Sequence, residues 1–269
     1  MSRLKPTFAR LKAENRKALV IYMTACDPDL ETAVAAAKAC IDGGADILEV
    51  GVPFSDPLAD GPVIQRAMIR ALEGGATFEK SLELVRQVRD YNADIPIVLF
   101  GYSNPFLWPG FEKSCDMAKD AGADGFLVVD LPPEEAGECR EAVHKRDMDW
   151  ISLIAPSSGD ARAKSIASQA TGFLYMISML GVTGGALKST AGAEAMIAAA
   201  KSVSDLPCCL GFGVRDATSA AAAARIADGV VVGSAVVKEL EAGMASGDGP
   251  KRVLDLVRKL RTGVDSVQA

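Results

Sequence analysis

The stretch GADILEVGVPFSDPLADG, residues 44–61, contains a helix-ending glycine, a short apolar run and a proline-rich loop in direct succession. Glycine is the residue that most often ends a helix, so Gly44 marks the point where a helix gives way to the next element. The run that follows is continuously apolar except for Glu49, which is typical of a parallel strand covered on both faces. The stretch therefore predicts one step of a helix–strand alternation.

The same punctuation recurs along the chain, at Gly122-Ala-Asp124 and, in a related form, at Ala227-Asp228-Gly229. Helical patterns separate the apolar runs, and this period favours a single (β/α)8 TIM barrel, with an open doubly wound sheet as the alternative. No linker or low-complexity tract divides the chain, so we expect one barrel domain over residues 1–269 with a short N-terminal helix. Strands are predicted at 18–24, 46–51, 95–102, 124–130, 149–155, 172–178, 206–213 and 228–234.

Composition narrows the class of partner. The net charge is −6 and the basic residues are scattered, so the positive patch that binds nucleic acid or an anionic membrane is missing. The six cysteines show no C-x-x-C spacing and His144 is the only histidine, which argues against a metal site or a His-based nucleophilic triad. The N-terminus has no apolar signal region and no run is long enough to span a membrane, so we expect a cytoplasmic protein.

Catalytic groups of such barrels lie at the carboxyl ends of the strands. Glu49 alternates with Leu48 and Val50, so its side chain points into the barrel mouth if those two face the helices. A carboxyl group in that partly dry place has a raised pKa, which suits a group that gives and takes a proton near neutral pH. The alternative is a structural glutamate paired with a backbone donor or a lysine. For Asp60, the alternative to a site residue is a turn former or a helix cap.

The last two predicted strands end in glycine instead of an acid. In GFGVRDAT (211–218) and GSAVVKEL (233–240), small residues precede a helix, so free backbone N–H groups could hold a phosphate, although glycine before a helix is also ordinary turn chemistry. The glycine-rich segment 178–190 is either a lid over the site or a plain connector. Apolar and aromatic residues near the same strand ends outline a pocket, unless they merely fill the barrel.

These segments resemble the tryptophan synthase alpha subunit family, and the resemblance runs nearly from end to end. LEVGVPFSDPLADG (48–61) is similar to that family's signature. Six further segments fall in the family's order: YMTACDPD (22–29), GYSNP (101–105), LVVDLPPEE (127–135), GVTGG (181–185), GFGV (211–214) and GSAVV (233–237).

The resemblance implies a retro-aldol cleavage of indole-3-glycerol phosphate to indole and glyceraldehyde 3-phosphate, without a metal or an organic cofactor. It implies that Glu49 is the proton shuttle and that Asp60 is the fixed anion that binds the indole N–H. Tyr175 would lie beside Glu49, and Thr183 would hold Asp60 once the 178–190 segment closes. The implied substrate-binding wall is Tyr22, Phe100, Tyr102, Leu127, Val129 and Phe212, and the implied phosphate cradle is Gly184, Gly213, Gly233 and Ser234.

The chain departs from commoner family choices at Tyr22, where phenylalanine is frequent, and at Met179, where arginine is frequent. The second departure concerns the contacts of the predicted lid. The resemblance also implies a pyridoxal-phosphate beta subunit as partner, in an alpha2beta2 complex that passes indole through a tunnel. The contact residues would be Pro53, Ser55, Asp56, Pro57, Asn104, Pro105, Phe106 and Pro132.

Three other functions remain open from the sequence. The chain could be an allosteric activator of a beta subunit without activity of its own, although the intact pair of acids argues against this. It could also be a lyase that works alone on the same substrate. A different phosphate-binding barrel enzyme is the weakest alternative, because its catalytic residues would not fall on the 48–61 signature.

Overall fold

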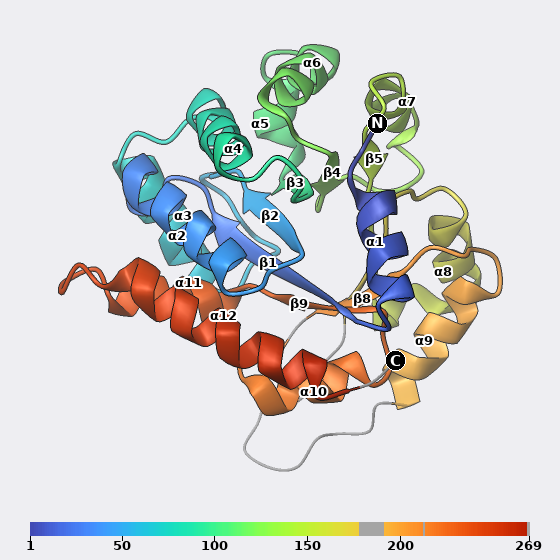
Figure 1. Ribbon diagram of the computed structural model, residues 1–269. Coiled ribbons are helices and arrows are strands. Elements are labelled where there is room, and N and C mark those ends of the chain that lie inside the picture. Colours follow the sequence, from blue (N-terminus) through green and yellow to red (C-terminus); the bar gives the residue numbers. More distant parts are fainter. Residues whose placement is uncertain (178–190, 212, 268–269) are drawn as a thin grey trace.

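The computed structural model describes residues 1–177, 191–211 and 213–267, and its strands form one parallel sheet in the order β5-β4-β3-β2-β1-β9-β8-β7-β6. Helices surround this sheet (Figure 1). The predicted TIM barrel is confirmed, and the open sheet is excluded. The strands are β1 Ala18–Thr24, β2 Ile47–Gly51, β3 Ile97–Gly101, β4 Gly125–Val128, β5 Asp149–Trp150, β6 Ser152–Ile154, β7 Leu174–Ile177, β8 Cys208–Gly211 and β9 Gly229–Val232.

The two ends of the sheet, β5 and β6, are pieces of one barrel strand. Only Ile151 separates them, and β5 pairs with β4 while β6 pairs with β7, so the ring closes through this strand. The Ile151 N–H still donates to the Phe126 carbonyl at 2.9 Å, and its side chain is buried inside the barrel. The single strand predicted over 149–155 is therefore split where it changes neighbour.

Most strands are followed by the predicted helix, but within the described residues an extra helix is present at three places. Two helices lie between β2 and β3, two lie between β3 and β4, and two follow β9. The described helices are α1 Leu4–Ala13, α2 Leu30–Asp42, α3 Pro62–Glu73, α4 Phe78–Tyr91, α5 Ser103–Leu107, α6 Phe111–Ala121, α7 Gly137–His144, α8 Gly159–Ala167, α9 Ala191–Lys201, α10 Ala217–Ala224, α11 Ser234–Ala242 and α12 Gly249–Asp265, and a 3-10 turn covers Pro156–Ser158.

Alternate residues of β1 show how the sheet sorts its side chains. Leu19, Ile21 and Met23 belong to the outer core between the sheet and the helices, whereas Ala18 and Val20 belong to the core inside the barrel. The α1 helix closes the lower end of that inner core with the buried side chains of its apolar face, Leu4, Phe8 and Leu11. The inner core thus fills the end of the barrel that α1 closes. The space for a ligand lies at the other end, the barrel mouth, where the strands have their carboxyl ends.

The aspartates of the repeated punctuation join neighbouring strands at this lower end. Gly44 and Gly122 have φ angles of 101° and 95°, as expected for glycines that end helices. The aspartate of each of these segments accepts a hydrogen bond from a backbone N–H group of the adjacent strand. The three bonds, each 2.9 Å long, are Leu19 N–H to Asp46, Ile97 N–H to Asp124 and Cys208 N–H to Asp228.

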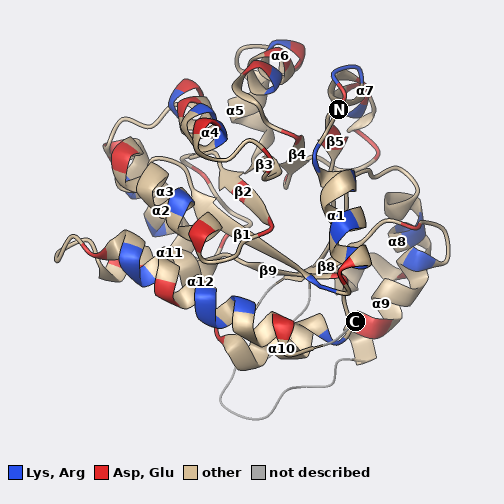
Figure 2. Cartoon of the chain, in the orientation of Figure 1, with Lys and Arg blue, Asp and Glu red and all other residues tan. Residues whose placement is uncertain are grey.

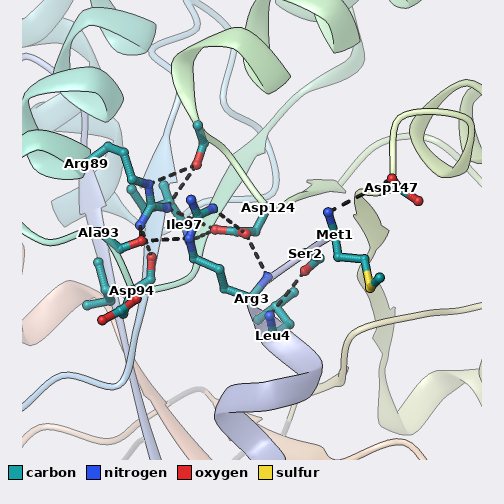
Figure 3. A network of polar contacts seen from close by, with 12 residues as sticks. Met1, Ser2, Arg3, Leu4, Arg89, Ala93, Asp94, Ile97, Asp124 and Asp147 are labelled. Atoms are coloured by element: carbon teal, nitrogen blue, oxygen red, sulfur yellow. Dashed lines mark hydrogen bonds and ion pairs between the residues drawn. The ribbon is translucent and has the colours of Figure 1, made fainter.

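Asp124 also ties the N-terminal segment to the barrel. Its buried carboxylate pairs with Arg3 at 3.0 Å and with Arg89 at 3.1 Å, and it accepts a further bond from the Arg3 N–H at 2.8 Å (Figure 3). The α1 helix begins at Leu4, directly after Arg3, so this cluster fixes the position of the helix that closes the barrel. Elsewhere, charges of both signs are interspersed along the outer helices (Figure 2).

Replacing Asp124 by asparagine is expected to lower the free energy of unfolding by about 3 kcal/mol, because two arginines would lose a buried anion. Urea unfolding would measure the loss. The control is Asp116→Asn: the Asp116 carboxylate is 62% exposed beside Arg146, and surface pairs of this kind contribute about 1 kcal/mol or less. Equal losses in the two variants would contradict a special role for Asp124.

Candidate active site

Glu49 lies on the inner face of β2, where the alternation of the sequence placed it. Its side chain is fully buried, and within the described residues neither carboxylate oxygen has a hydrogen-bond partner. Burial raises its pKa to about 8, from an ordinary value of 4.5. Within the described residues, neither a backbone donor nor a lysine binds this carboxylate, so they do not support the alternative of a structural glutamate. The raised pKa favours the protonated form of Glu49 near neutral pH.

Asp60 lies in the loop between β2 and α3. Its N–H donates to the Pro57 carbonyl at 3.0 Å, so its main chain does form a turn. Its side chain is no helix cap, because α3 starts from Gly61 without a side-chain cap bond. Instead the carboxylate accepts a hydrogen bond from the Tyr102 hydroxyl at 2.7 Å. Burial raises the pKa of Asp60 and the Tyr102 bond opposes that rise.

Two tyrosines of the barrel, the buried Tyr22 and the partly buried Tyr175, are affected by the charges of both acids. Burial raises the pKa of the Tyr175 phenol, and the charges of Glu49 and Asp60 raise it further. The same is true of Tyr22, for which burial is again the largest cause, followed by the charge of Asp60 and, more weakly, that of Glu49. Tyr22 pairs in register with Glu49, and Tyr175 packs against the core inside the barrel, so both phenols lie on the same inner side of the sheet as Glu49. Among the charged groups that act on Tyr175, Glu49 has the largest effect. The predicted role of Tyr175 beside Glu49 stays a prediction.

Each tyrosine occupies room left by a glycine on the neighbouring strand. Gly51 pairs with Thr24, and the Tyr22 phenol covers Gly51 so closely that a Cβ atom there would overlap the ring. Gly211 is paired in the same way with Ile177, and a Cβ atom would lie 2.5 Å from the Tyr175 hydroxyl. Sequence reasoning gave Gly51 no role, because its contact with Tyr22 depends on the strand register.

The predicted apolar wall is largely assembled at the mouth. Tyr22 packs edge-on against Phe100, with ring centroids 5.1 Å apart. Tyr102 packs against Phe54, with ring centroids 5.2 Å apart. Phe54 was not among the residues predicted from the sequence. Leu127 is fully buried in the inner core, so it forms part of the floor. The cluster at the mouth consists of Tyr22, Ile64, Ala67, Met68, Tyr102 and Val237, with Phe54, Val63, Phe100 and Val129 packed against it.

The two predicted anion sites at helix N-termini differ in the structure. The α10 helix begins with a capping box, in which the Asp216 carboxylate accepts the Ser219 N–H at 2.8 Å. This cap occupies one of the N–H groups at the start of α10, so a phosphate bound near this helix would depend on the preceding loop that contains Gly213. The phosphate role of that loop stays a prediction. The α11 helix starts from Gly233 and Ser234 with no side-chain cap bond, which leaves its N–H groups for a ligand. Gly213, with a φ angle of 86°, stands in the loop between β8 and α10.

Several predicted residues lie outside the part of the chain that the structure describes. They are Thr183, Gly184 and Phe212, together with Met179 and the rest of the 178–190 segment. The described site consists of the acids, the tyrosines, most of the wall and the start of α11.

The predicted partner contacts divide into surface and core. Ser55, Asp56, Asn104 and Pro132 are exposed and Pro105 is half-buried. Pro53, Pro57 and Phe106 are buried, so in this structure they cannot touch a partner. Phe106 packs edge-on between Phe78 and Phe126, because the short α5 helix turns this side chain into the core. Large apolar side chains of the same loops are exposed instead: Leu58 by 89%, Leu107 by 50% and Trp108 by 88%.

Comparison with known proteins shows the family of this chain. The family model described as Tryptophan synthase alpha chain matches residues 8–265. The tryptophan synthase alpha chain of Methylococcus capsulatus is 46% identical over 267 residues, which cover 99% of this chain and 100% of the relative. The alpha chain of Thiobacillus denitrificans is also 46% identical, over 99% of this chain and 97% of its own length.

Solved structures give the same answer. The crystal structure of tryptophan synthase subunit alpha from Legionella pneumophila superposes with a TM-score of 0.91 at 36% identity, covering 99% of this chain and 100% of that one. A chain of tryptophan synthase from M. tuberculosis gives 0.88 at 37% identity, with coverages of 98% and 99%. None of the described helices is both long and apolar enough to cross a membrane. From the signature, the barrel, the pair of acids and these matches over nearly its whole length, the chain belongs to the tryptophan synthase alpha chain family.

Proposed function

We propose that this chain cleaves indole-3-glycerol phosphate to indole and glyceraldehyde 3-phosphate, and that Glu49 and Asp60 carry the reaction. The observation that supports it best is the fully buried Glu49 on the inner face of β2, whose carboxyl oxygens have no hydrogen-bond partner among the described residues. A lyase of this kind breaks the bond between C3 of the indole ring and the glycerol carbon. That step requires a proton donor, a base and an anion. In this proposal Glu49 is the donor and then the base, and Asp60 is the anion.

The reaction begins with Glu49 in its protonated form. Glu49 donates its proton to C3, and the ring becomes a cationic indoleninium. The resulting carboxylate then removes the proton from the hydroxyl group on the adjacent glycerol carbon. As that carbon becomes an aldehyde, the electrons of the breaking bond return to the ring, and Glu49 is again protonated. Because every step is a proton transfer or a bond cleavage within the substrate, the chain needs no cofactor of its own.

Asp60 binds the indole N–H and stabilises the cation. Its attraction for that N–H grows as the ring gains positive charge, so the interaction favours the transition state over the bound substrate. Tyr102 holds the carboxylate in place through the 2.7 Å bond. The family resemblance adds Thr183, which lies outside the described residues. Tyr175 orients the reacting hydroxyl beside Glu49. The proposed wall around the indole ring consists of Tyr22, Phe100, Leu127 and Val129. The family resemblance adds Phe212, which lies outside the described residues.

The phosphate group lies at the start of α11. Gly233 and Ser234 supply backbone N–H groups there. The family resemblance adds Gly213 and also Gly184, which lies outside the described residues. Gly233 lies against the Tyr22 ring, since a Cβ atom on this glycine would be 3.3 Å from the tyrosine side chain. The phosphate end and the ring end of the pocket therefore share one wall.

An assay of indole release tests the proposal. The purified chain is mixed with indole-3-glycerol phosphate, with and without the beta subunit of the same source. The proposal expects slow release by the chain alone and strong stimulation by the beta subunit. If the chain releases no indole under either condition, the remaining function is that of an activator without activity of its own. Fast release that the beta subunit does not stimulate would indicate a lyase that works alone.

We also propose that a beta subunit binds at the carboxyl-end loops of the barrel, in an alpha2beta2 complex. The exposed Ser55, Asp56, Asn104 and Pro132, with Pro105, would surround the apolar Leu58 and Trp108. Exposed apolar residues framed by polar ones are typical of protein contacts. Pyridoxal phosphate belongs to the beta subunit.

Replacing Trp108 by serine is expected to weaken binding of the beta subunit by about tenfold or more, since large aromatic residues dominate such contacts. Turnover by the isolated chain should not change. The control is Val203→Ser: Val203 is 48% exposed and precedes β8, so it lies at the opposite end of the barrel. Titration of stimulated indole release gives both affinities, and equal weakening by the two changes would exclude the proposed surface.

We further propose that the whole chain is one domain and works in the cytoplasm. The core inside the barrel joins residues from α1 at the beginning of the chain to Val231 in β9, which supports a single folding unit. All six cysteines are free thiols, as is usual in a reducing compartment.

A further inference from the structure

A cluster of charged residues outside the pocket connects three elements that form it. Asp27 follows β1 and is fully buried. Arg70, on α3, binds both oxygens of Asp27 at 2.9 Å through Nε and Nη2. The remaining nitrogen, Nη1, binds Glu241 of α11 at 2.6 Å. Arg66, one turn earlier on α3, pairs with the same glutamate at 2.9 and 2.8 Å.

Each of the three elements carries part of the pocket. The β1 strand carries Tyr22, which lies in the wall. The α3 helix begins two residues after Asp60, and its buried side chains pack under Tyr22 and Tyr102. The α11 helix begins at Ser234, where the phosphate is expected to bind. Arg70 therefore joins the ring-binding side of the pocket to the phosphate-binding side.

Glu241 lies in the last turn of α11, where its charge depends on the two arginines of α3. An acidic residue in the last turn of a helix is unfavourable, because that end of the helix carries partial negative charge. The last turn of α11 has no basic residue to offset it. The two arginines of α3 supply the missing positive charge, so this glutamate is favourable only while α3 and α11 stay in register.

We propose that Arg70 is a positioning residue that sets the distance between Asp60 and the N-terminus of α11, an inference that rests on the proposed function. Both helices are rigid, and α11, with nine residues, is only about 13 Å long. A shift where Arg70 meets Glu241 is therefore transmitted to Ser234 at the other end of α11. Arg70 touches neither the ring nor the phosphate.

A substrate that spans both ends of the pocket is sensitive to that distance, whereas a fragment that occupies one end is not. Glu241→Gln removes the charge but keeps the shape of the side chain. We expect kcat/KM for indole-3-glycerol phosphate to fall by about 10- to 100-fold, the loss that misplacement of a bound substrate by about 1 Å can cause. Binding of indole alone and of inorganic phosphate alone should change by less than about twofold, since neither end is altered.

Arg70→Lys is the second variant. Lysine keeps the positive charge but cannot bind Asp27 with two nitrogens and Glu241 with a third. It should therefore reproduce the loss seen with Glu241→Gln. Thermal unfolding identifies the temperature at which both variants are folded, and the assays are made there.

The matched control is Glu239→Gln, on the same helix. Glu239 pairs with Arg252 of α12 at 3.0 Å, so its ion pair is with α12 and not with α3. Normal turnover in this control, with the loss confined to the other two variants, would support positioning by Arg70. Equal losses in Glu239→Gln and Glu241→Gln, or equal weakening of fragments and substrate, would reduce the cluster to a structural role. An unmodified chain that releases no indole under any condition would instead refute the proposed function.

Discussion

Replacing Glu49 by glutamine is expected to reduce indole release by about 10²- to 10⁴-fold, the usual contribution of a general acid and base. Glutamine has nearly the same shape, but it can neither donate a proton to C3 nor remove one from the hydroxyl group. Phosphate binding should be unaffected, because the start of α11 is unchanged. Steady-state turnover and phosphate affinity, measured on the same preparation, check both statements.

The pKa of Glu49 provides a control for folding. The group has a pKa of about 8 in the folded chain and 4.5 as its ordinary value, so the folded state holds this proton more tightly than the unfolded state does. The free energy of unfolding therefore falls as the pH rises from about 4.5 to 8, by a few kcal/mol at most, since one pKa unit corresponds to about 1.4 kcal/mol. Glutamine has no such dependence.

At pH 8 the Glu49→Gln chain should consequently resist urea at least as well as the unmodified chain, and its lost activity cannot then be ascribed to unfolding. In the unmodified chain, turnover should decline above about pH 8 as Glu49 loses the proton that the first step needs. Turnover within a few fold of normal in the glutamine variant would rule out the proton shuttle.

Asp60→Asn is expected to lower turnover by about 10²- to 10³-fold, as the loss of one preorganised electrostatic contact does elsewhere. The amide oxygen can still accept the Tyr102 hydrogen bond, so the loop keeps its position while the negative charge opposite the indole N–H is lost. The loss should appear mainly in kcat, because the charge matters most when the ring is cationic.

Tyr102→Phe provides the graded comparison. It keeps the anion and removes only the 2.7 Å bond that holds it, so the expected loss of turnover is smaller, about tenfold. A fall in substrate affinity with an unchanged kcat in Asp60→Asn would show that Asp60 contributes uniform binding and does not stabilise the transition state.

Much of the site could be predicted because it depends on local pattern. Glu49 interrupts an apolar strand, and the two-residue period of a strand then places its side chain inside the barrel, opposite Leu48 and Val50. The partner surface was predicted less well. Proline and phenylalanine in a loop look alike in the sequence whether they face solvent or the core, and Phe106 faces the core between two other rings.

The N-termini of α10 and α11 also looked alike, and only the position of the Asp216 carboxylate distinguishes them. Asp216 lies one residue before the start of α10, where the helix boundary decides whether it is a cap. A prediction of boundaries within one or two residues is too coarse for that decision.

The sequence by itself determined the alternation of strands and helices, the inward direction of Glu49 and the family, because these follow from spacing along the chain. Only the tertiary structure decided which glycine makes room for which tyrosine, how α1 closes the barrel and how Arg70 joins Asp27 to Glu241. The physical reason is distance along the chain: Arg70 and Glu241 are 171 residues apart. Contacts between such residues exist only after the barrel has closed and its neighbouring strands are in register.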